Sequence, residues 1–166
     1  MTTVKLVTLA LAAAILAGCA SQRSGQFEIA NLKYGTICGT AYQDVCTQTA
    51  DIAIDGKGLC IYDHQDVPCT WYGFSFDYDS RFDGIVIDCD ATTDYKIDVG
   101  NPQGIIQKDA TDQRYQAQLH DGRYVNPQYA LYVPFDGVRH LTESCSYQGQ
   151  QLFRFTLNLR HVSDTP

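Results

Sequence analysis

The segment from Gln151 to His161, QLFRFTLNLRH, alternates between apolar and polar side chains. Every second residue from Phe153 to His161 is an apolar residue or a histidine, and the residues between them are Arg, Thr and Asn. Because successive side chains of a β-strand point to opposite faces, this pattern predicts a strand with one buried face. The carboxyl-terminal part of the chain is therefore expected to form one wall of a β-sheet core.

A second pair of segments, 71–78 and 85–90, shows the same alternation. If Tyr78 pairs with Ile85, the two segments form a hairpin in which both apolar faces lie on the same side. A shift of one residue would turn one face away from the core, so the pattern favours this register. It also directs Cys89 into the core.

Shorter apolar stretches predict further strands at 27–34, 37–42, 51–54, 59–62, 95–99, 115–119, 129–133 and 144–147. Three Asp-Gly steps, which are typical of turns, separate some of them: Asp55-Gly56, Asp121-Gly122 and Asp136-Gly137. Many short strands divided by turns predict an all-β, disulfide-stapled antiparallel β-sandwich, with a small β-barrel as the alternative. Helical turns are alternatives only near 41–48 and 108–114.

The composition agrees with one globular domain. The chain has 166 residues, of which 45% are hydrophobic, enough to bury a core. Its acidic residues are 17 Asp and only 2 Glu, a ratio that disfavours a helical bundle, since Asp favours turns and caps. The formal net charge of −7 excludes nucleic acid as an expected partner, because phosphate binding needs clustered cations.

Residues 1–18 have the pattern of an export signal. One cation, Lys5, precedes an apolar run of 12 residues at 6–17. That run is too short to cross a hydrocarbon core of ~30 Å as a helix, which takes roughly 20 residues. It ends in Leu-Ala-Gly-Cys at 16–19, which resembles the lipobox of bacterial lipoproteins. The alternative is an ordinary secretory signal with a coincidental Cys19.

The resemblance implies lipidation of Cys19 by a diacylglyceryl group, removal of the signal before it, and acylation of the new amino group, with palmitate as an expected chain. Several acyl chains hold a protein firmly on a bilayer. Ala20 follows Cys19, whereas Asp at this position retains well-studied Gram-negative lipoproteins at the inner membrane. The resemblance therefore implies lipid anchoring at the outer membrane, on its periplasmic or its surface face.

These features divide the chain into four parts. We expect a lipoprotein signal peptide at 1–18, a lipidated tether at 19–26, a β-sandwich domain at 27–162 and a polar tail at 163–166. The chain from Cys19 onward carries 11 Lys and Arg against 19 Asp and Glu, a formal net charge of −8.

Six cysteines remain besides Cys19, and an even number in an exported chain indicates three disulfides, with 15 possible connectivities. The candidates are Cys38, Cys46, Cys60, Cys69, Cys89 and Cys145. The short spacings favour Cys38 with Cys46 and Cys60 with Cys69, which leaves Cys89 for Cys145. A metal site is the alternative, but no C-x-x-C occurs and the four His are scattered, so we predict no metal and no cofactor.

The order Cys60, Trp71, Cys145 resembles the pattern of immunoglobulin domains, in which a core Trp packs on a disulfide between the sheets. The Tyr that those domains carry two residues before the second Cys is replaced here by Glu143. The sandwich is therefore predicted from the strand pattern, with the immunoglobulin fold as one possibility within it.

Acidic residues concentrate between Asp44 and Asp112, where fourteen Asp and four cations give a net charge of −10. The hairpin register above would place several of them on one outer face. This candidate binding surface consists of Asp77, Asp79, Asp88 and Asp90. It would bind a basic protein or Ca²⁺, or it is simply a solvated face that keeps β-edges from pairing.

A second candidate surface is aromatic. Tyr combines a large ring with a polar tip, which suits binding surfaces. Four tyrosines cluster near the Arg-richer end of the chain and could contact a protein or a glycan: Tyr115, Tyr124, Tyr129 and Tyr132. Strands are rich in Tyr in any case, so a purely structural role is the alternative.

The sequence carries no recognisable nucleophile, metal or cofactor motif. We therefore expect a membrane-anchored envelope lipoprotein that is not an enzyme, with a protein-binding or structural role and an envelope protein as its partner. One alternative is an inhibitor or immunity lipoprotein that neutralises a cell-wall-degrading enzyme through a protruding loop. Another is a hydrolase using Asp or His, which predicts a concave pocket with carboxylates of raised pKa.

Overall fold

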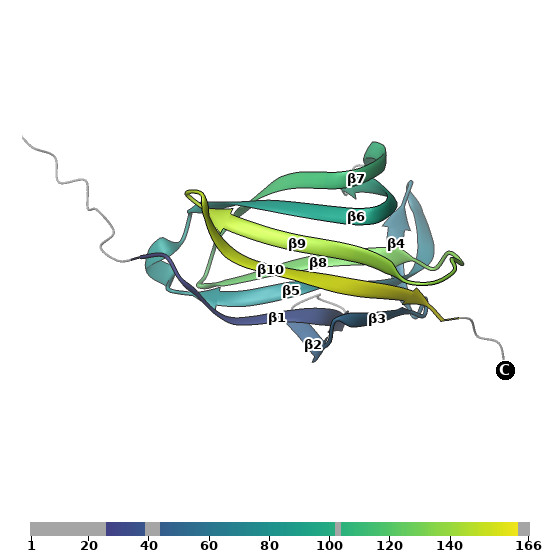
Figure 1. Ribbon diagram of the computed structural model, residues 1–166, viewed down its shortest axis with the longest axis horizontal. Helices are drawn as coiled ribbons and strands as arrows, with labels where there is room; N and C mark the ends of the chain where they lie inside the picture. Colours follow the sequence, from purple (N-terminus) through teal and green to yellow (C-terminus); the bar gives the residue numbers. More distant parts are fainter. Residues whose placement is uncertain (1–25, 39–43, 102–103, 163–166) are drawn as a thin grey trace, which may run out of the picture.

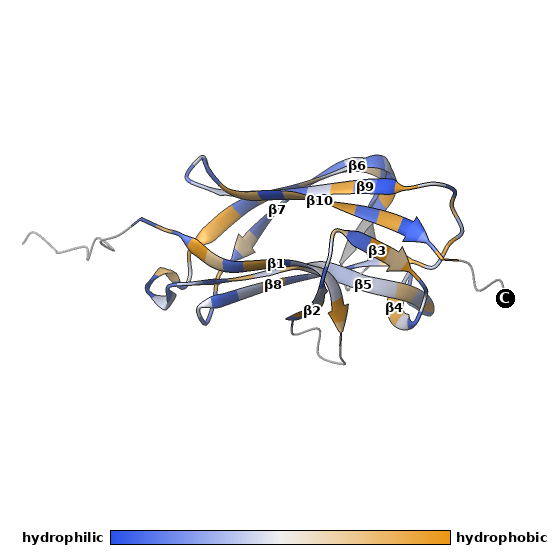
Figure 2. Cartoon of the chain, turned by 60° about the horizontal axis from the view of Figure 1, so that its bottom comes forward, coloured by the Kyte–Doolittle hydropathy of each residue, from blue (hydrophilic) through white to orange (hydrophobic). Residues whose placement is uncertain are grey.

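Two β-sheets packed face to face make up the computed structural model, which describes residues 26–38, 44–101 and 104–162. Figure 2 shows the sheets as two layers, and the buried apolar residues of both sheets form one core cluster. The strands do not close into a single barrel. The predicted all-β, disulfide-stapled sandwich is therefore confirmed, and the small barrel is not formed.

The first sheet, sheet A, is antiparallel and has five strands. Its strands are β1 (Ile29–Cys38), β2 (Asp44–Gln48), β4 (Gly58–Tyr62), β5 (Gln65–Tyr78) and β8 (Arg123–Leu131). The long strand β5 is central: it pairs with β1 along one edge and with β4 and then β8 along the other.

The second sheet, sheet B, also has five strands. They are β3 (Asp51–Ile54), β6 (Val86–Asn101), β7 (Gly104–Gln118), β9 (Arg139–Tyr147) and β10 (Gln150–His161), in the order β3-β10-β9-β6-β7. All neighbours are antiparallel except β3, which runs parallel to β10. The edge strand β7 of sheet B and the edge strand β8 of sheet A therefore border the same flank of the sandwich (Figure 1).

The carboxyl-terminal strand behaves as its alternation predicts. Phe153, Phe155, Leu157 and Leu159 on β10 are all at most 7% exposed, whereas Arg154 on the opposite face is exposed. Aromatic rings fill the space between the sheets: the ring of Phe74 on β5 lies 5.1 Å from Phe153 and 5.7 Å from Phe155. Burial of these rings supplies the main stabilisation of the sandwich.

The expected hairpin of 71–78 with 85–90 is wrong. The apolar faces are buried as predicted, but β5 belongs to sheet A and β6 to sheet B. The connection between them contains a 3₁₀ turn, Ser80–Phe82, that carries the chain from one layer to the other. Alternation indicates which residues face the core, but two facing layers satisfy that pattern as well as one hairpin does.

Several expected boundaries also differ. The segments expected at 27–34 and 37–42 are parts of one strand, β1, which begins at Ile29 and ends at Cys38. The segments expected at 85–90 and 95–99 are parts of β6, which begins at Val86. The helical alternatives at 44–48 and 108–114 are strands; residues 39–43 lie outside the described residues. The three Asp-Gly steps lie between strands, as predicted. In the described part of the chain, no helix is long and apolar enough to span a membrane.

The three predicted cysteine pairs are confirmed. The pairs are Cys38–Cys46, Cys60–Cys69 and Cys89–Cys145. Each links strands within one sheet: β1 to β2, β4 to β5, and β6 to β9. The immunoglobulin pattern of a disulfide between sheets is therefore not present in these three bonds, and Trp71 packs edge-on against Tyr129 at 5.2 Å.

Asp44 at the start of β2 ties this strand to the rest of sheet A. Its carboxylate accepts hydrogen bonds from the Ser75 hydroxyl and the Val45 amide, both at 2.7 Å, and lies 2.6 Å from the Arg123 guanidinium. Desolvation raises the pKa of Asp44, but hydrogen bonds from Ser75 and Val45 and the Arg123 charge outweigh it, so the pKa is lowered.

We expect Asp44→Asn to lower the free energy of unfolding by about 1 kcal/mol at pH 7, because the carboxylate is partly exposed and screened. Since the folded pKa is depressed, this contribution is present above the pKa of the unfolded chain and disappears as pH falls through the folded value. Urea denaturation at pH 7 and pH 3 measures it. Asp66→Asn removes the same charge at an exposed position and is the control. Equal effects of both variants would contradict the role of the Asp44 network.

Candidate functional site

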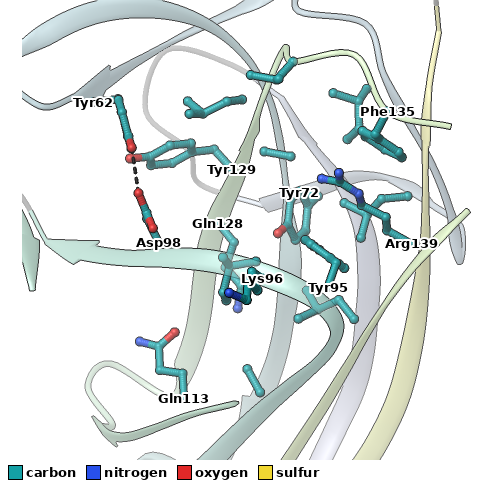
Figure 3. A pocket seen from close by; sticks show the side chains of 18 of the residues that line it. Tyr62, Tyr72, Tyr95, Lys96, Asp98, Gln113, Gln128, Tyr129, Phe135 and Arg139 are labelled. Carbon is teal, nitrogen blue, oxygen red and sulfur yellow. Dashed lines mark hydrogen bonds between the residues drawn. The ribbon is translucent and has the colours of Figure 1, made fainter. Parts of the chain in front are cut away.

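A cavity of about 590 Å³ lies between the two sheets on the flank bordered by β7 and β8. Its walls come from the end of β4, the middle of β6 and β7, most of β8 and the segment that leads into β9 (Figure 3). The volume lies within the range of about 300–1,000 Å³ that is typical of small-molecule sites. The cavity sits at the end of the sandwich opposite the start of β1 (Figure 1).

Aromatic rings dominate the lining. They are Tyr62, Tyr72, Tyr95, Tyr115, Tyr129 and Phe135. Amide side chains from Gln113, Asn126 and Gln128 lie among them. Such a surface offers flat apolar faces together with hydrogen-bonding groups that both donate and accept.

Tyr72 lies at the bottom of the cavity, where β5 faces sheet B. The residue is only 6% exposed, and its hydroxyl points into the cavity (Figure 3). No hydrogen bond joins that hydroxyl to another described residue. Burial raises the pKa of Tyr72 well above its usual value, so the hydroxyl is protonated and can donate as well as accept.

Arg139 at the start of β9 supplies a positive charge. Its guanidinium carbon lies 4.0 Å from the centre of the Phe135 ring and 4.9 Å from that of Tyr95. The two rings hold the cation in place through cation–π contacts. No carboxylate within the described residues forms an ion pair with Arg139, and the side chain reaches into the cavity (Figure 3).

Asp98 lines the cavity on its other side, toward β4. Its carboxylate accepts a hydrogen bond of 2.7 Å from the Tyr62 hydroxyl and another from the Asp109 amide (Figure 3). These two hydrogen bonds lower the pKa of Asp98, so the group is ionised at neutral pH. The cavity thus has the Arg139 cation on one side, and on the other the Asp98 carboxylate with Lys96, which forms an ion pair with Asp109 at 3.8 Å.

A buried carboxyl group, Glu143 on β9, lies behind the cavity wall. It is 1% exposed, and it accepts hydrogen bonds from the Tyr115 hydroxyl at 3.1 Å and from the Gln128 amide. Asn126 in turn donates to the Tyr115 hydroxyl at 2.6 Å. Burial raises the pKa of Glu143 to about 7, although the hydrogen bonds from Gln128 and Tyr115 oppose the shift. The network joins β9 and β7 of sheet B to β8 of sheet A.

The predicted tyrosine surface is formed only in part. Tyr115 and Tyr129 line the cavity. Tyr124 packs instead on Phe76 in the core, at 5.5 Å, and Tyr132 stacks on a histidine at the chain's carboxyl-terminal end. Tyr124 and Tyr129 are five positions apart on β8, so their side chains point to opposite faces of the strand, whereas Tyr132 lies beyond the end of β8.

The predicted acidic surface is not formed as one surface. Asp77 lies on sheet A, where it accepts hydrogen bonds from Asn31 and Arg123. Asp88 and Asp90 lie on the outer face of sheet B, and Asp79 caps the 3₁₀ turn. The correction follows from the wrong hairpin register, which put strands of different sheets side by side. Cys19 and the signal lie outside the described residues, so lipidation stays a prediction.

Sequence reasoning missed Tyr72, Tyr95 and Arg139, because no local pattern distinguishes them from ordinary strand residues. Glu143 did leave a signal. It alternates with Leu141 and Cys145, a pattern that places an acidic residue on the buried face of a strand, but the strand expected from the sequence was only 144–147 and did not include it. Within the described residues, no group of three His, Cys, Asp or Glu side chains is placed to hold a metal ion.

No protein-family model and no curated protein sequence matches this chain. Among solved structures, the chain is similar to an immunoglobulin-like protein from Pseudomonas aeruginosa, with a TM-score of 0.54 and 11% sequence identity. The match covers 82% of this chain and 98% of that one. At this identity the likeness shows the fold alone, an immunoglobulin-like sandwich.

Proposed function

We propose that this chain is a lipid-anchored envelope protein whose sandwich binds another envelope component in the cavity between its sheets, without catalysing a reaction. The observation that carries the proposal is the position of the cavity. It lies toward the end of the sandwich opposite the start of β1, and the acylated Cys19 would be joined to that start (Figure 1). An anchored molecule would therefore present the cavity away from the bilayer.

The short tether would keep the amino-terminal end of the sandwich close to the bilayer. Eight residues, 19–26, reach at most ~26 Å at ~3.3 Å each. The amino-terminal end of the sandwich is packed from its first residues, since Phe27 contacts Phe82 at 5.3 Å and Tyr147 at 5.1 Å. That end would lie close to the lipid, and the opposite end would be accessible to a partner in the envelope.

The ionisable groups support binding rather than hydrolysis. A hydrolase would need a carboxyl group of raised pKa in contact with its substrate. The carboxylate that lines the cavity, Asp98, has a lowered pKa. Glu143 has the raised pKa, but it is 1% exposed and both of its oxygens accept hydrogen bonds from side chains of the wall.

The anchoring part of the proposal predicts that Cys19→Ala releases the protein from the membrane fraction. The acyl chains provide the whole anchor, so their loss removes roughly 0.8 kcal/mol per buried CH₂ of membrane affinity. Membrane fractionation and incorporation of labelled palmitate measure the change, and Ser21→Ala is the matched control. A Cys19→Ala protein that stays in the outer membrane with its signal removed would refute the lipid anchor.

The binding part is tested by photo-crosslinking in intact cells. A photoreactive residue replaces Val133, which lines the cavity and is 57% exposed, or Arg154, which is exposed on the outer face of sheet B. We expect an adduct from position 133 and none from position 154. Adducts of equal yield at both positions, or turnover of a cell-wall substrate by the purified protein, would contradict a non-enzymatic binding role for the cavity.

A further inference from the structure

We propose that the cavity recognises a saccharide unit that carries a carboxylate, an inference that rests on the binding role proposed above and names its ligand. The carboxylate would bind at Arg139, the hydroxyl groups would bond to Tyr72 and the amides, and the sugar ring would lie against aromatic faces. Each of these three contacts has its own structural evidence.

The hydroxyl of Tyr72, which makes no hydrogen bond to a described residue, indicates that the cavity binds a polar ligand. A hydroxyl that opens into a cavity can bond to a group that enters it, and polar groups inside native proteins are nearly always hydrogen-bonded. The Tyr72 residue is only 6% exposed, its hydroxyl points into the cavity (Figure 3), and no hydrogen bond joins this hydroxyl to a described residue. A ligand hydroxyl would satisfy it.

The free charge of Arg139 indicates an anionic group on the ligand. A planar guanidinium presents a fork of donors that matches a carboxylate. Phe135 and Tyr95 fix the orientation of this fork before binding, which reduces the entropy lost when the ligand is held. The other cation that lines the cavity, Lys96, already forms an ion pair with Asp109 at 3.8 Å.

The amides explain the preference for hydroxyl groups. Gln128 and Asn126 each use the NH₂ group to donate within the wall, so their carbonyl oxygens remain as acceptors. Together with Gln113 they supply several acceptors beside the Tyr72 donor. A sugar hydroxyl donates and accepts at once, and such a mixed set suits it. Tyr95 and Tyr129 offer rings on which its apolar face can lie.

The edge of β8 disfavours a peptide ligand that binds as an added strand. Strand addition needs a continuous row of backbone donors and acceptors along the free edge. Pro127 lies in the middle of β8, opposite Gly73 of β5, and it has no N–H to donate. The cavity is therefore better suited to a ligand bound by side chains.

Titration calorimetry on the full-length lipidated protein in detergent tests the proposal with three probes. The probes are D-glucuronic acid, D-glucose, which lacks its carboxylate, and a capped Gly-Glu-Gly peptide, which has a carboxylate but no sugar. We expect glucuronic acid to bind in preference to the other two. Arg139→Gln should weaken its binding about thirtyfold, and Tyr72→Phe about fivefold.

Two control variants keep the outcomes distinct. Arg154→Gln removes an exposed charge on sheet B, and Tyr147→Phe removes a hydroxyl near the opposite end of the sandwich. Neither should change binding. Tyr72→Phe removes a hydroxyl that makes no hydrogen bond to a described residue, so the melting temperature should stay close to that of the unmodified protein and weaker binding would not reflect misfolding.

Preferred binding of the peptide, equal binding of glucose and glucuronic acid, or no saturable binding would each overturn the carboxylated-saccharide proposal. These outcomes are separate from failure of the proposed function. An adduct at position 133 without saccharide binding would keep the cavity as a binding site with a different ligand. The absence of an adduct at position 133 would instead contradict the proposal that the cavity is a binding site.

Discussion

Replacing Cys89 and Cys145 together by Ala is expected to lower the free energy of unfolding by about 4 kcal/mol. This disulfide joins residues separated by 56 positions, far more than the 8 and 9 of the other two. A cross-link that closes a longer loop removes more conformational entropy from the unfolded chain. Both cysteines are 1% exposed and lie directly opposite each other on β6 and β9, so the bond also holds the centre of sheet B together.

The measurement is guanidinium denaturation of the double variant against the unmodified protein. The matched control is Cys38→Ala with Cys46→Ala, which opens a short loop and should cost about 2 to 3 kcal/mol. Single domains are stable by about 5–15 kcal/mol, so the larger loss would be evident as a much lower midpoint. If the two double variants lost the same stability, the dependence on loop length would be wrong for this chain.

Short-range patterns predicted much of this fold. Alternation along 151–161 gave a strand whose buried residues are the ones expected, and cysteine spacing gave the three pairs. Both signals are local, because a strand repeats every two residues and a short loop restricts which thiols can meet. The segment 51–54 is likewise a strand with the predicted bounds.

Long-range pairing could not be predicted in the same way. The sequence around Tyr78 and Ile85 indicates two inward faces joined by a short connection, and a hairpin and a crossing between layers both satisfy it. Asp79 and Phe82 decide between them in the structure: Asp79 caps the 3₁₀ turn and Phe82 is buried against Phe27. The cap and the buried ring direct the chain into the second sheet.

The cavity was outside the reach of sequence reasoning for a related reason. Tyr72 on β5 and Arg139 on β9 are far apart in the chain and lie in different sheets. Their proximity depends on how the layers pack, which no spacing rule expresses. Of the residues predicted on a binding surface, Tyr115 on β7 and Tyr129 on β8 line the cavity, whereas Tyr124 lies on β8 as well but faces the core.

Glu143 gives the molecule an expected dependence of stability on pH in the neutral range. Burial raises the pKa of its carboxyl group to about 7, from 4.5 for an unperturbed glutamate. The folded protein therefore binds a proton more tightly than the unfolded chain does. Stability from this group is fully present below the unfolded pKa and is lost as pH rises through about 7. The protein should be about 2 kcal/mol less stable at pH 8 than at pH 5 through this group alone.

The variant Glu143→Gln isolates this contribution. Gln is neutral at every pH and nearly the same shape, so it can still accept the hydrogen bond of the Tyr115 hydroxyl. We expect its stability to be close to that of the unmodified protein at pH 5 and about 2 kcal/mol higher at pH 8. Asp66→Asn, which removes an exposed carboxylate, should leave the pH dependence between these values unchanged.

Urea denaturation at pH 5, 6, 7 and 8 measures the difference between the two proteins. Glu143 is surrounded by neutral tyrosines and faces one further acid, Asp90, whose charge also raises its pKa. Tyr115 stays protonated, since burial raises its pKa above the usual value, and it does not titrate in this range. A constant difference between Glu143→Gln and the unmodified protein across all four pH values would show that Glu143 keeps one charge state throughout and that burial does not control its ionisation.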